Sequence, residues 1–170
     1  MDTELKRLIN DIQKQGRSDP GNCKATLQTS SILAGRFRSD VKIRDHEITI
    51  DEPEAIGGSD EGPNPVELIL AALGSCQEIT YRAYAAALGI SINNISVEME
   101  GDIDFRGFFG VDDNIRPGFE KIRARVKIES DAPESDIERL RKTVNSHCPV
   151  LDILSNKVSV DLDLIVAVEA

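Results

Sequence analysis

Residues 62–76 read Gly-Pro-Asn-Pro-Val-Glu-Leu-Ile-Leu-Ala-Ala-Leu-Gly-Ser-Cys and open the longest helix that the sequence predicts. Pro65 suits the first turn of a helix, and the helical pattern continues to Leu88, before Gly89. Apolar or small residues occupy both sides of an ideal helical wheel, which is typical of a central helix that is covered on most sides. The small residues between positions 71 and 75 would let another helix approach closely.

Shorter segments on both sides of this helix have the alternation or the β-branched content of strands. We expect strands at residues 25–33, 40–44, 47–50, 94–104, 119–129 and 158–168. The capping-box pattern Ser135-Asp136-Ile137-Glu138 predicts the start of a second helix, with a bend before Pro149 and a short helix to Leu154. This order of strands and helices predicts an α+β fold.

The N-terminal segment differs from the rest of the chain. Residues 2–15 have the apolar spacing of a short amphipathic helix, and a breaker-rich run follows it. We therefore divide the chain into an N-terminal helix with its linker (1–22) and one domain (23–170). Within the domain, the loop 51–64 is rich in Pro, Gly and Asp, which marks it as irregular and as a candidate for site formation.

The composition predicts a soluble protein with an acidic surface. The 170 residues include 20 basic and 30 acidic side chains, for a net charge of −10. The electrostatic field of this negative net charge repels nucleic-acid phosphates and anionic lipid headgroups, so neither nucleic acid nor a membrane is an expected partner. Charged residues interrupt the apolar tract 65–90, which excludes it as a membrane span. Residues 1–15 lack the apolar core of a secretory signal, which predicts a cytoplasmic location.

Two of the three cysteines, Cys76 and Cys148, lie in apolar helical stretches. A buried cysteine is most often a small apolar packing residue, whereas two such residues brought together could form a redox pair. Cys148 either caps the short helix that starts at Pro149, where a thiolate is favoured, or ends the preceding helix, where it is disfavoured. Burial of Cys76 would raise its pKa, so its reactivity would require a nearby cation. Cys23, in a linker, is expected to be exposed to solvent and to have no role in the chemistry.

A metal site is not expected, because no Cys-x-x-Cys or His-x-x-x-His spacing occurs. His147 adjoins Cys148, but neighbours on a helix point about 100° apart, which disfavours chelation by this pair. His46 is expected in a hairpin turn, exposed to solvent. Gly57-Gly58 lacks the pattern of a phosphate loop, and Ser75 lacks the frame of an esterase nucleophile.

Three ordered segments resemble the OsmC/Ohr family of thiol-dependent hydroperoxide reductases. They are Asp51-Glu52-Pro53-Glu54-x-x-Gly57-Gly58, the run Gly62 to Cys76 with its Asn64-Pro65-x-Glu67-Leu68, and Cys148-Pro149-Val150 with the following Leu154. The resemblance covers residues 24–168 and implies an intertwined homodimer. In that fold, antiparallel sheets wrap two long central helices, and each active site lies at the dimer interface.

The resemblance also implies a mechanism and the roles of two residues. Cys76 would attack the peroxide oxygen and become a sulfenic acid, and Cys148 would condense with it to a disulfide. The substrate would be an organic hydroperoxide, and an external dithiol of the lipoyl or thioredoxin type would reset the disulfide. No metal and no organic cofactor is implied.

Family members also use an arginine to stabilise the thiolate and orient the peroxide. Arg36 is the best match as the activating cation, and Arg38 is the second match and a substrate-binding candidate. The glutamate that holds this arginine follows the Asn-Pro directly in the family, and here that position is Val66. The adjacent Glu67 faces away from the cysteine on the wheel, so our hypothesis is a divergent member in which Glu52 or Glu54 holds the cation.

Two other functions remain open from the sequence. A binding module could hold an apolar ligand in a cleft lined by Leu73 and by Phe108 and Phe109, which lie at the apolar tip of the connection 105–118. In that case the cysteines would be packing residues. Alternatively, the thiol pair could reduce disulfides or handle persulfides.

Overall fold

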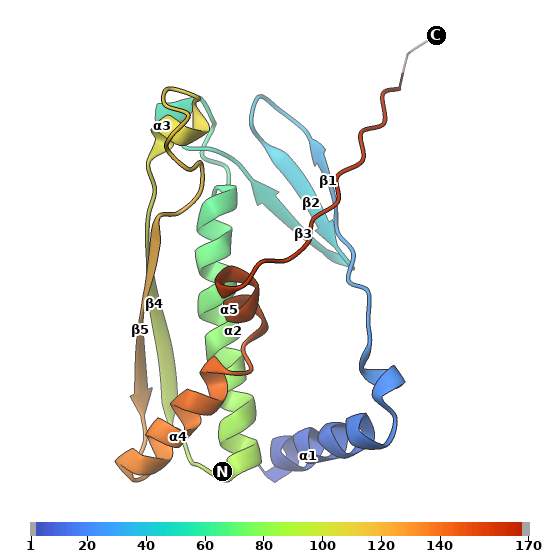
Figure 1. The fold of residues 1–170 in the computed structure, drawn as a ribbon, viewed down its shortest axis with the longest axis vertical. Helices are drawn as coiled ribbons and strands as arrows, with labels where there is room; N and C mark the ends of the chain where they lie inside the picture. The colour runs from blue at the N-terminus through green and yellow to red at the C-terminus, as the bar shows by residue number, and fades with distance from the viewer. Residues whose placement is uncertain (1–2, 168–170) are drawn as a thin grey trace.

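The computed structural model describes residues 3–167, in which helices and strands alternate along the chain (Figure 1). The elements are α1 (Thr3–Ser18), η1 (Pro20–Cys23), β1 (Ser30–Leu33), β2 (Ser39–Ile43), β3 (His46–Ile50), η2 (Glu54–Ile56), α2 (Pro65–Leu88), β4 (Asn94–Asp102), α3 (Phe105–Phe108), β5 (Lys121–Glu129), α4 (Glu134–Asn145) and α5 (Pro149–Ser155). They form an α+β fold with antiparallel sheets, as the order of sequence patterns predicts.

The long helix α2 begins and ends where the sequence predicts. Asn64 caps it, since its Oδ1 accepts from the Glu67 amide at 2.9 Å, while Glu67 Oε2 accepts from the Asn64 amide at 2.9 Å. Pro65 occupies the first turn, where no intrahelical partner for its nitrogen is needed. Gly89 ends the helix with a φ of 72°, a left-handed conformation that glycine adopts without strain.

Two separate antiparallel sheets lie on different sides of α2 (Figure 1). Strands β1, β2 and β3 form one sheet, in which a tight turn at Arg44 and Asp45 joins β2 to β3. His46 was expected in this turn, but it is the first residue of β3, and it is exposed. Strands β4 and β5 form the other sheet, with Asn94 opposite Glu129 and Asp102 opposite Lys121.

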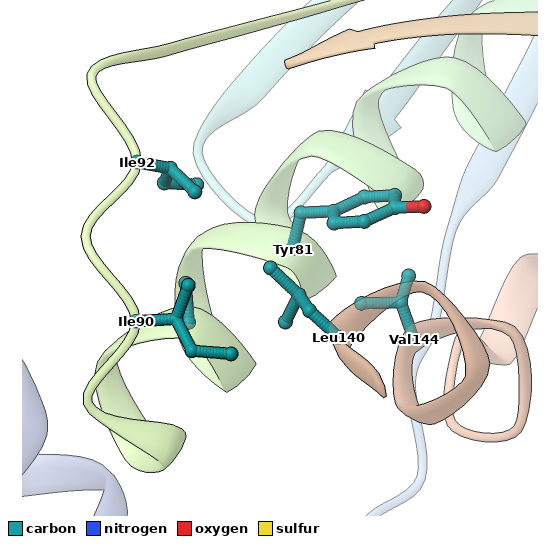
Figure 2. Close-up of a cluster of buried hydrophobic side chains, with 6 residues drawn as sticks. Tyr81, Ile90, Ile92, Leu140 and Val144 are labelled. Carbon is teal, nitrogen blue, oxygen red and sulfur yellow. The ribbon is translucent and has the colours of Figure 1, made fainter. Parts of the chain in front are cut away.

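The hydrophobic core lies between α2, α4 and the segment that leaves α2. Leu140 and Val144 of α4 are fully buried and lie beside Tyr81 of α2, with Ile90 and Ile92 completing the cluster (Figure 2). Side chains of β4 and β5 pack around this cluster. Burial of each large side chain contributes about 1.5–3 kcal/mol, so this cluster fixes α4 on α2.

The sheet β1–β3 does not share that core. Its extensive contacts are between its own strands, and α2 instead contacts α1, β4, α4 and α5. Figure 1 shows the three strands standing away from β4 and β5, on the other side of α2. Ile32 and Leu33 of β1 are 70% and 67% exposed, so this sheet presents large apolar side chains that the described chain does not cover.

Four expectations about the elements are corrected by the structure. The N-terminal helix continues through Gly16 to Ser18, and β1 is only four residues long. The capping box at Ser135 does not form, because α4 starts at Glu134 and Glu138 pairs with Arg141 instead. Residues 157–167 form no helix or strand and lead away from the rest of the described chain (Figure 1), and Val168, the predicted end of the last strand, lies outside the described residues.

Within residues 3–167, no helix combines the length and the apolar character needed to cross a membrane.

Candidate active site

The structure brings Cys76 and Cys148 together. Cys76 is the twelfth of the 24 residues of α2, and Cys148 immediately precedes α5. The Cys148 Sγ lies 3.3 Å from the Cys76 Sγ, and both residues are free thiols. A disulfide requires about 2.05 Å between the sulfurs, so a movement of little more than 1 Å would form the bond.

Local geometry at the start of α5 fixes Cys148. The residue is the N-cap of α5, with an extended backbone, and its carbonyl accepts from the Asp152 amide at 3.0 Å. Pro149 follows at the first helical position. A proline disfavours a helical conformation for the residue before it, which accounts for the expected bend between α4 and α5. Cys148 is only 1% exposed, whereas Cys76 is half-buried. Cys76 is therefore the more accessible sulfur of the pair.

The environment of Cys76 favours the neutral thiol. Burial raises the pKa of Cys76, and the neighbouring Cys148 raises it further. The Val150 amide and the nearby Thr80 side chain, whose hydroxyl donates to the Cys76 carbonyl at 2.6 Å, act to lower the pKa, but they do not offset the other two effects. The interactions that dominate this pKa in the described chain include no basic side chain. A reactive thiolate at Cys76 would therefore need a cation that is not among these interactions.

The two candidate arginines differ sharply in their surroundings. Arg36 is exposed and forms no ion pair within residues 3–167. Arg38 is held on two sides, because its Nε lies 3.0 Å from Asp40 Oδ1 and its Nη1 lies 2.9 Å from Glu61 Oε2. Within residues 3–167 neither Glu52 nor Glu54 forms an ion pair with either arginine, whereas Asp40 and Glu61 contact Arg38.

A buried carboxylate organises the loop that carries Glu61. Asp51 is 1% exposed and accepts hydrogen bonds from the amides of Glu52 at 2.8 Å, Ser59 at 3.0 Å and Glu61 at 3.3 Å. Burial acts to raise the pKa of Asp51, but these amides and the charge of Arg38 outweigh it and hold the pKa below its ordinary value. Sequence reasoning missed this role, although a single Asp at the start of a Gly-rich loop is a usable signal for such a turn.

The apolar residues proposed to line one cleft are separated. Leu73 is buried and lines a cavity of about 400 Å³ together with Gln77, Tyr81 and residues of β4, β5, α4 and α5. Phe108 and Phe109 are exposed near α3, pack edge to face with ring centroids 5.0 Å apart, and do not line that cavity.

The remaining cysteine and the histidine beside the site have other surroundings. Cys23 is exposed, as expected. His147 shares a 2.7 Å hydrogen bond with the Thr143 carbonyl through Nδ1, and its ring packs against Tyr84. In the part of the chain that the structure describes, no three His, Cys, Asp or Glu side chains are grouped so that they could hold a metal ion.

Comparison with known proteins identifies relatives of this site and fold. The family model described as OsmC-like protein matches residues 58–163. The chain is 27% identical over 121 residues to the protein YmaD of Bacillus subtilis (strain 168), an alignment that covers 68% of this chain and 75% of YmaD.

Solved structures with the same fold come from several bacteria. An OsmC-like protein from Mycoplasma pneumoniae superposes with a TM-score of 0.66 at 21% identity, covering 78% of this chain and 89% of that one. A protein from Legionella pneumophila described as an organic hydroperoxide resistance protein OsmC superposes with a TM-score of 0.59 at 21% identity, covering 77% and 91% of the two chains. At these identities the likeness establishes the fold.

Proposed function

Because the chain belongs to the OsmC-like protein family, we propose that it is a cysteine-based peroxidase that reduces organic hydroperoxides. The proposal rests on one observation, the 3.3 Å separation of the Cys76 and Cys148 sulfurs. Packing alone does not require two free thiols to face each other at the start of a helix. A relative described as an organic hydroperoxide resistance protein shares the fold and supports the choice of substrate class.

The first chemical step takes place at Cys76. Its thiolate attacks one oxygen of the hydroperoxide, the O–O bond breaks, and the departing alkoxide takes a proton to leave as an alcohol. The sulfur gains the OH group and becomes a sulfenic acid, so it is oxidised by two electrons while the peroxide is reduced. Cys76 fits this role because it is the more accessible of the two sulfurs.

The second step joins the two sulfurs and the third resets them. Cys148 attacks the sulfenic sulfur of Cys76, the S–O bond breaks, and the OH group leaves as water with the proton of Cys148. A dithiol of the lipoyl or thioredoxin type then reduces the disulfide through a mixed disulfide and becomes a disulfide itself. A cytoplasmic location belongs to the proposal, because such reductants keep thiols reduced there.

The proposal includes a homodimer, which the surface of α2 supports. Ile69, Ala72, Cys76 and Ile79 recur at helical spacing and form one stripe. Ile79 is 69% exposed and Ile69 is 41% exposed, which is unusual for large apolar residues on a central helix. Pairing this stripe with its copy would bury both isoleucines and place Cys76 at the interface.

The C-terminal segment supports the same assembly. Residues 157–167 are extended and carry exposed apolar side chains, including Leu162 at 90% and Leu164 at 88% exposure. In the described chain, β5 pairs only with β4, so its other edge is open. The cavity beside β5 is lined by Gln77, Leu73 and Tyr81 of α2. A strand from a second copy would pair with the open edge of β5.

Direct oxidation of the reduced protein tests the function. One equivalent of cumene hydroperoxide should be consumed and yield cumyl alcohol, and peptide mass spectrometry should find a Cys76–Cys148 linkage. The Cys76→Ser variant should consume no peroxide, while the matched control Cys23→Ser should behave as the wild type. Peroxide that persists while Cys76 and Cys148 stay reduced would contradict the proposal.

A further inference from the structure

We propose that the cavity between α2, α4, α5 and the sheet β4–β5 binds a small organic carboxylate with an apolar body. The cavity has a volume of about 400 Å³, and Leu73, Gln77 and Tyr81 of α2 line it. Neither Cys76 nor Cys148 is among the lining residues, so this site is separate from the place where a peroxide would meet the thiol. The inference therefore goes beyond the proposed peroxidase and does not depend on it.

One end of the cavity is apolar. Leu73 of α2 and Met99 of β4 lie at this end, since a Cβ on Gly74 would be 3.6 Å from the Met99 Cγ. Ala124 of β5 is paired with Met99 across the sheet, and Leu151 of α5 completes the apolar wall. A cavity of this size with mainly apolar walls and a few polar groups is typical of a site for a small organic molecule.

The other end of the cavity is polar. Tyr81 lies two turns beyond Leu73 on α2, and Arg141 and Asn145 of α4 line the cavity with it. Figure 2 shows the Tyr81 hydroxyl pointing away from Ile90 and out of the core cluster. Burial raises the pKa of Tyr81, although Arg141 acts to lower it, so the phenol is a hydrogen-bond donor at neutral pH. The polar head of a ligand would therefore lie toward α4 and its apolar body toward Leu73.

Gln77 is a polar residue within a buried stripe of α2. The stripe consists of Leu73, Gln77, Tyr81 and Ala85, which recur every four residues and are all buried. Gln77 is 4% exposed and lines the cavity between its two ends. An apolar side chain would suit this position better if it served packing alone, because burial of an amide is costly. Its amide offers a donor and an acceptor to a ligand in the cavity.

The charges at the polar end favour an anion. Arg141 donates to Glu138 through Nε at 2.7 Å and through Nη2 at 2.8 Å, which leaves its Nη1 outside this contact. Lys142 Nζ also lies 3.6 Å from Glu138. Two cations therefore share one carboxylate, and one positive charge remains at this end of the cavity. A carboxylate head would pair with that charge, whereas a cationic head would be repelled.

The two methionines of the chain, Met1 and Met99, allow a site-specific test. Labelling their methyl groups with carbon-13 yields one NMR signal from the cavity and one from the chain terminus. The reduced full-length protein is titrated with sodium decanoate at concentrations below those at which it forms micelles. The Met99 signal should shift and reach saturation, while the Met1 signal serves as the internal reference.

Variants of the charged residues test the assigned head group. Arg141→Ala should weaken the binding of decanoate about tenfold, as expected for the loss of one charge-assisted hydrogen bond, and should leave the binding of decan-1-ol unchanged. Glu138→Gln should tighten the binding of decanoate, because it leaves Arg141 and Lys142 without their shared carboxylate. Arg139→Ala is the matched control, since Arg139 lies on the same helix and pairs with Asp136.

A filled cavity provides a second, independent measurement. Ala124→Phe would place an aromatic ring in the cavity and should abolish the Met99 shift. Lys127→Phe adds the same ring to the opposite face of β5 and should bind decanoate as the wild type does. Thermal unfolding of the two variants checks that both are folded.

The outcomes separate this inference from the proposed function. A Met99 signal that does not respond to decanoate would overturn the inference, and the cavity would then be filled in solution, for example by residues 157–167 of a second copy. Equal effects of Arg141→Ala on decanoate and decan-1-ol would overturn it as well, because the head group would not be recognised. Cys76→Ser removes the nucleophile of the proposed peroxidase and should bind decanoate unchanged. Binding of decanoate by a protein that consumes no hydroperoxide would overturn the peroxidase and leave the inference standing.

Discussion

The sulfurs of Cys76 and Cys148 lie 3.3 Å apart, although 72 positions separate these residues in the sequence. Their contact joins the middle of α2 to the residue that caps α5. Each sulfur is therefore positioned by a different helix, and the pair depends on how α4 and α5 pack against α2.

Removal of Cys148 should trap the first oxidation product. In Cys148→Ser the sulfenic acid of Cys76 has no thiol partner in reach, so it should persist long enough to react with dimedone and then proceed to sulfinic acid. Mass spectrometry of the Cys76 peptide after one and ten equivalents of cumene hydroperoxide measures both products. The Cys23→Ser protein is the control, and an equal yield of disulfide in Cys148→Ser through Cys23 would contradict the assignment.

A charge within the α2 stripe should dissociate the dimer. Ile79→Glu would bury an unpaired carboxylate in each copy of the interface, at a cost of about 3 kcal/mol or more, which weakens association at least a hundredfold. Sedimentation equilibrium at micromolar concentration measures the change. Asn10→Glu, an exposed site on α1, adds the same charge and should leave the mass unchanged. A dimer that survives Ile79→Glu would exclude this stripe as the interface.

The isolated chain should contain an unreactive Cys76. Burial, followed by the effect of Cys148, raises the pKa of this thiol above its ordinary value, so the thiolate fraction falls tenfold for each pH unit below that raised value. In Ile79→Glu the labelling of Cys76 should therefore rise only at alkaline pH, while in the wild type, as the proposed dimer, it should rise at lower pH. Identical profiles in the two proteins would show that no group of the second copy acts on this thiol.

The core beneath the site should be sensitive to truncation. Leu140 has 0% exposure and packs against Tyr81, so Leu140→Ala should lower the free energy of unfolding by about 2–5 kcal/mol. Urea denaturation followed by circular dichroism measures this change at one fixed protein concentration. Leu27 is 91% exposed, and Leu27→Ala should change stability little. Equal effects of the two substitutions would contradict the assigned core.

Asp51 should contribute stability that depends on pH. Its pKa in the folded chain is held below the ordinary value, so its contribution is complete above the unfolded-state pKa of about 4 and is lost as the pH falls through the lower folded value. Thermal unfolding of the wild type should therefore show a steeper fall in Tm below pH 4 than that of Asp51→Asn. Asp60→Asn, on the same loop but exposed, is the control and should follow the wild type.

The helix α2 was predictable because its signals are local. Asn64, Pro65 and Gly89 act through bonds to near neighbours in the sequence, so the pattern alone determines both ends. The bend before α5 was predictable for the same reason, since Pro149 restricts the residue before it.

The partners of Arg38 were not predictable in this way. Glu61 is 23 positions away and reaches the arginine only because Asp51 folds the loop back on itself. The final strand was predicted from its alternation, but alternation indicates an apolar face and does not say which chain pairs with it. Both features depend on long-range pairing, which propensity does not encode.

The separation of the sheet β1–β3 from the core of its own chain has a kinetic consequence. In the proposed homodimer this sheet gains its covering surface from the second copy, so its folding would be completed in a bimolecular step. Refolding of this part should therefore accelerate with protein concentration, whereas the core around Leu140 should form at a rate independent of dilution. The abundance of the chain in the cell would then set how long newly made copies expose their apolar strands to chaperones and proteases.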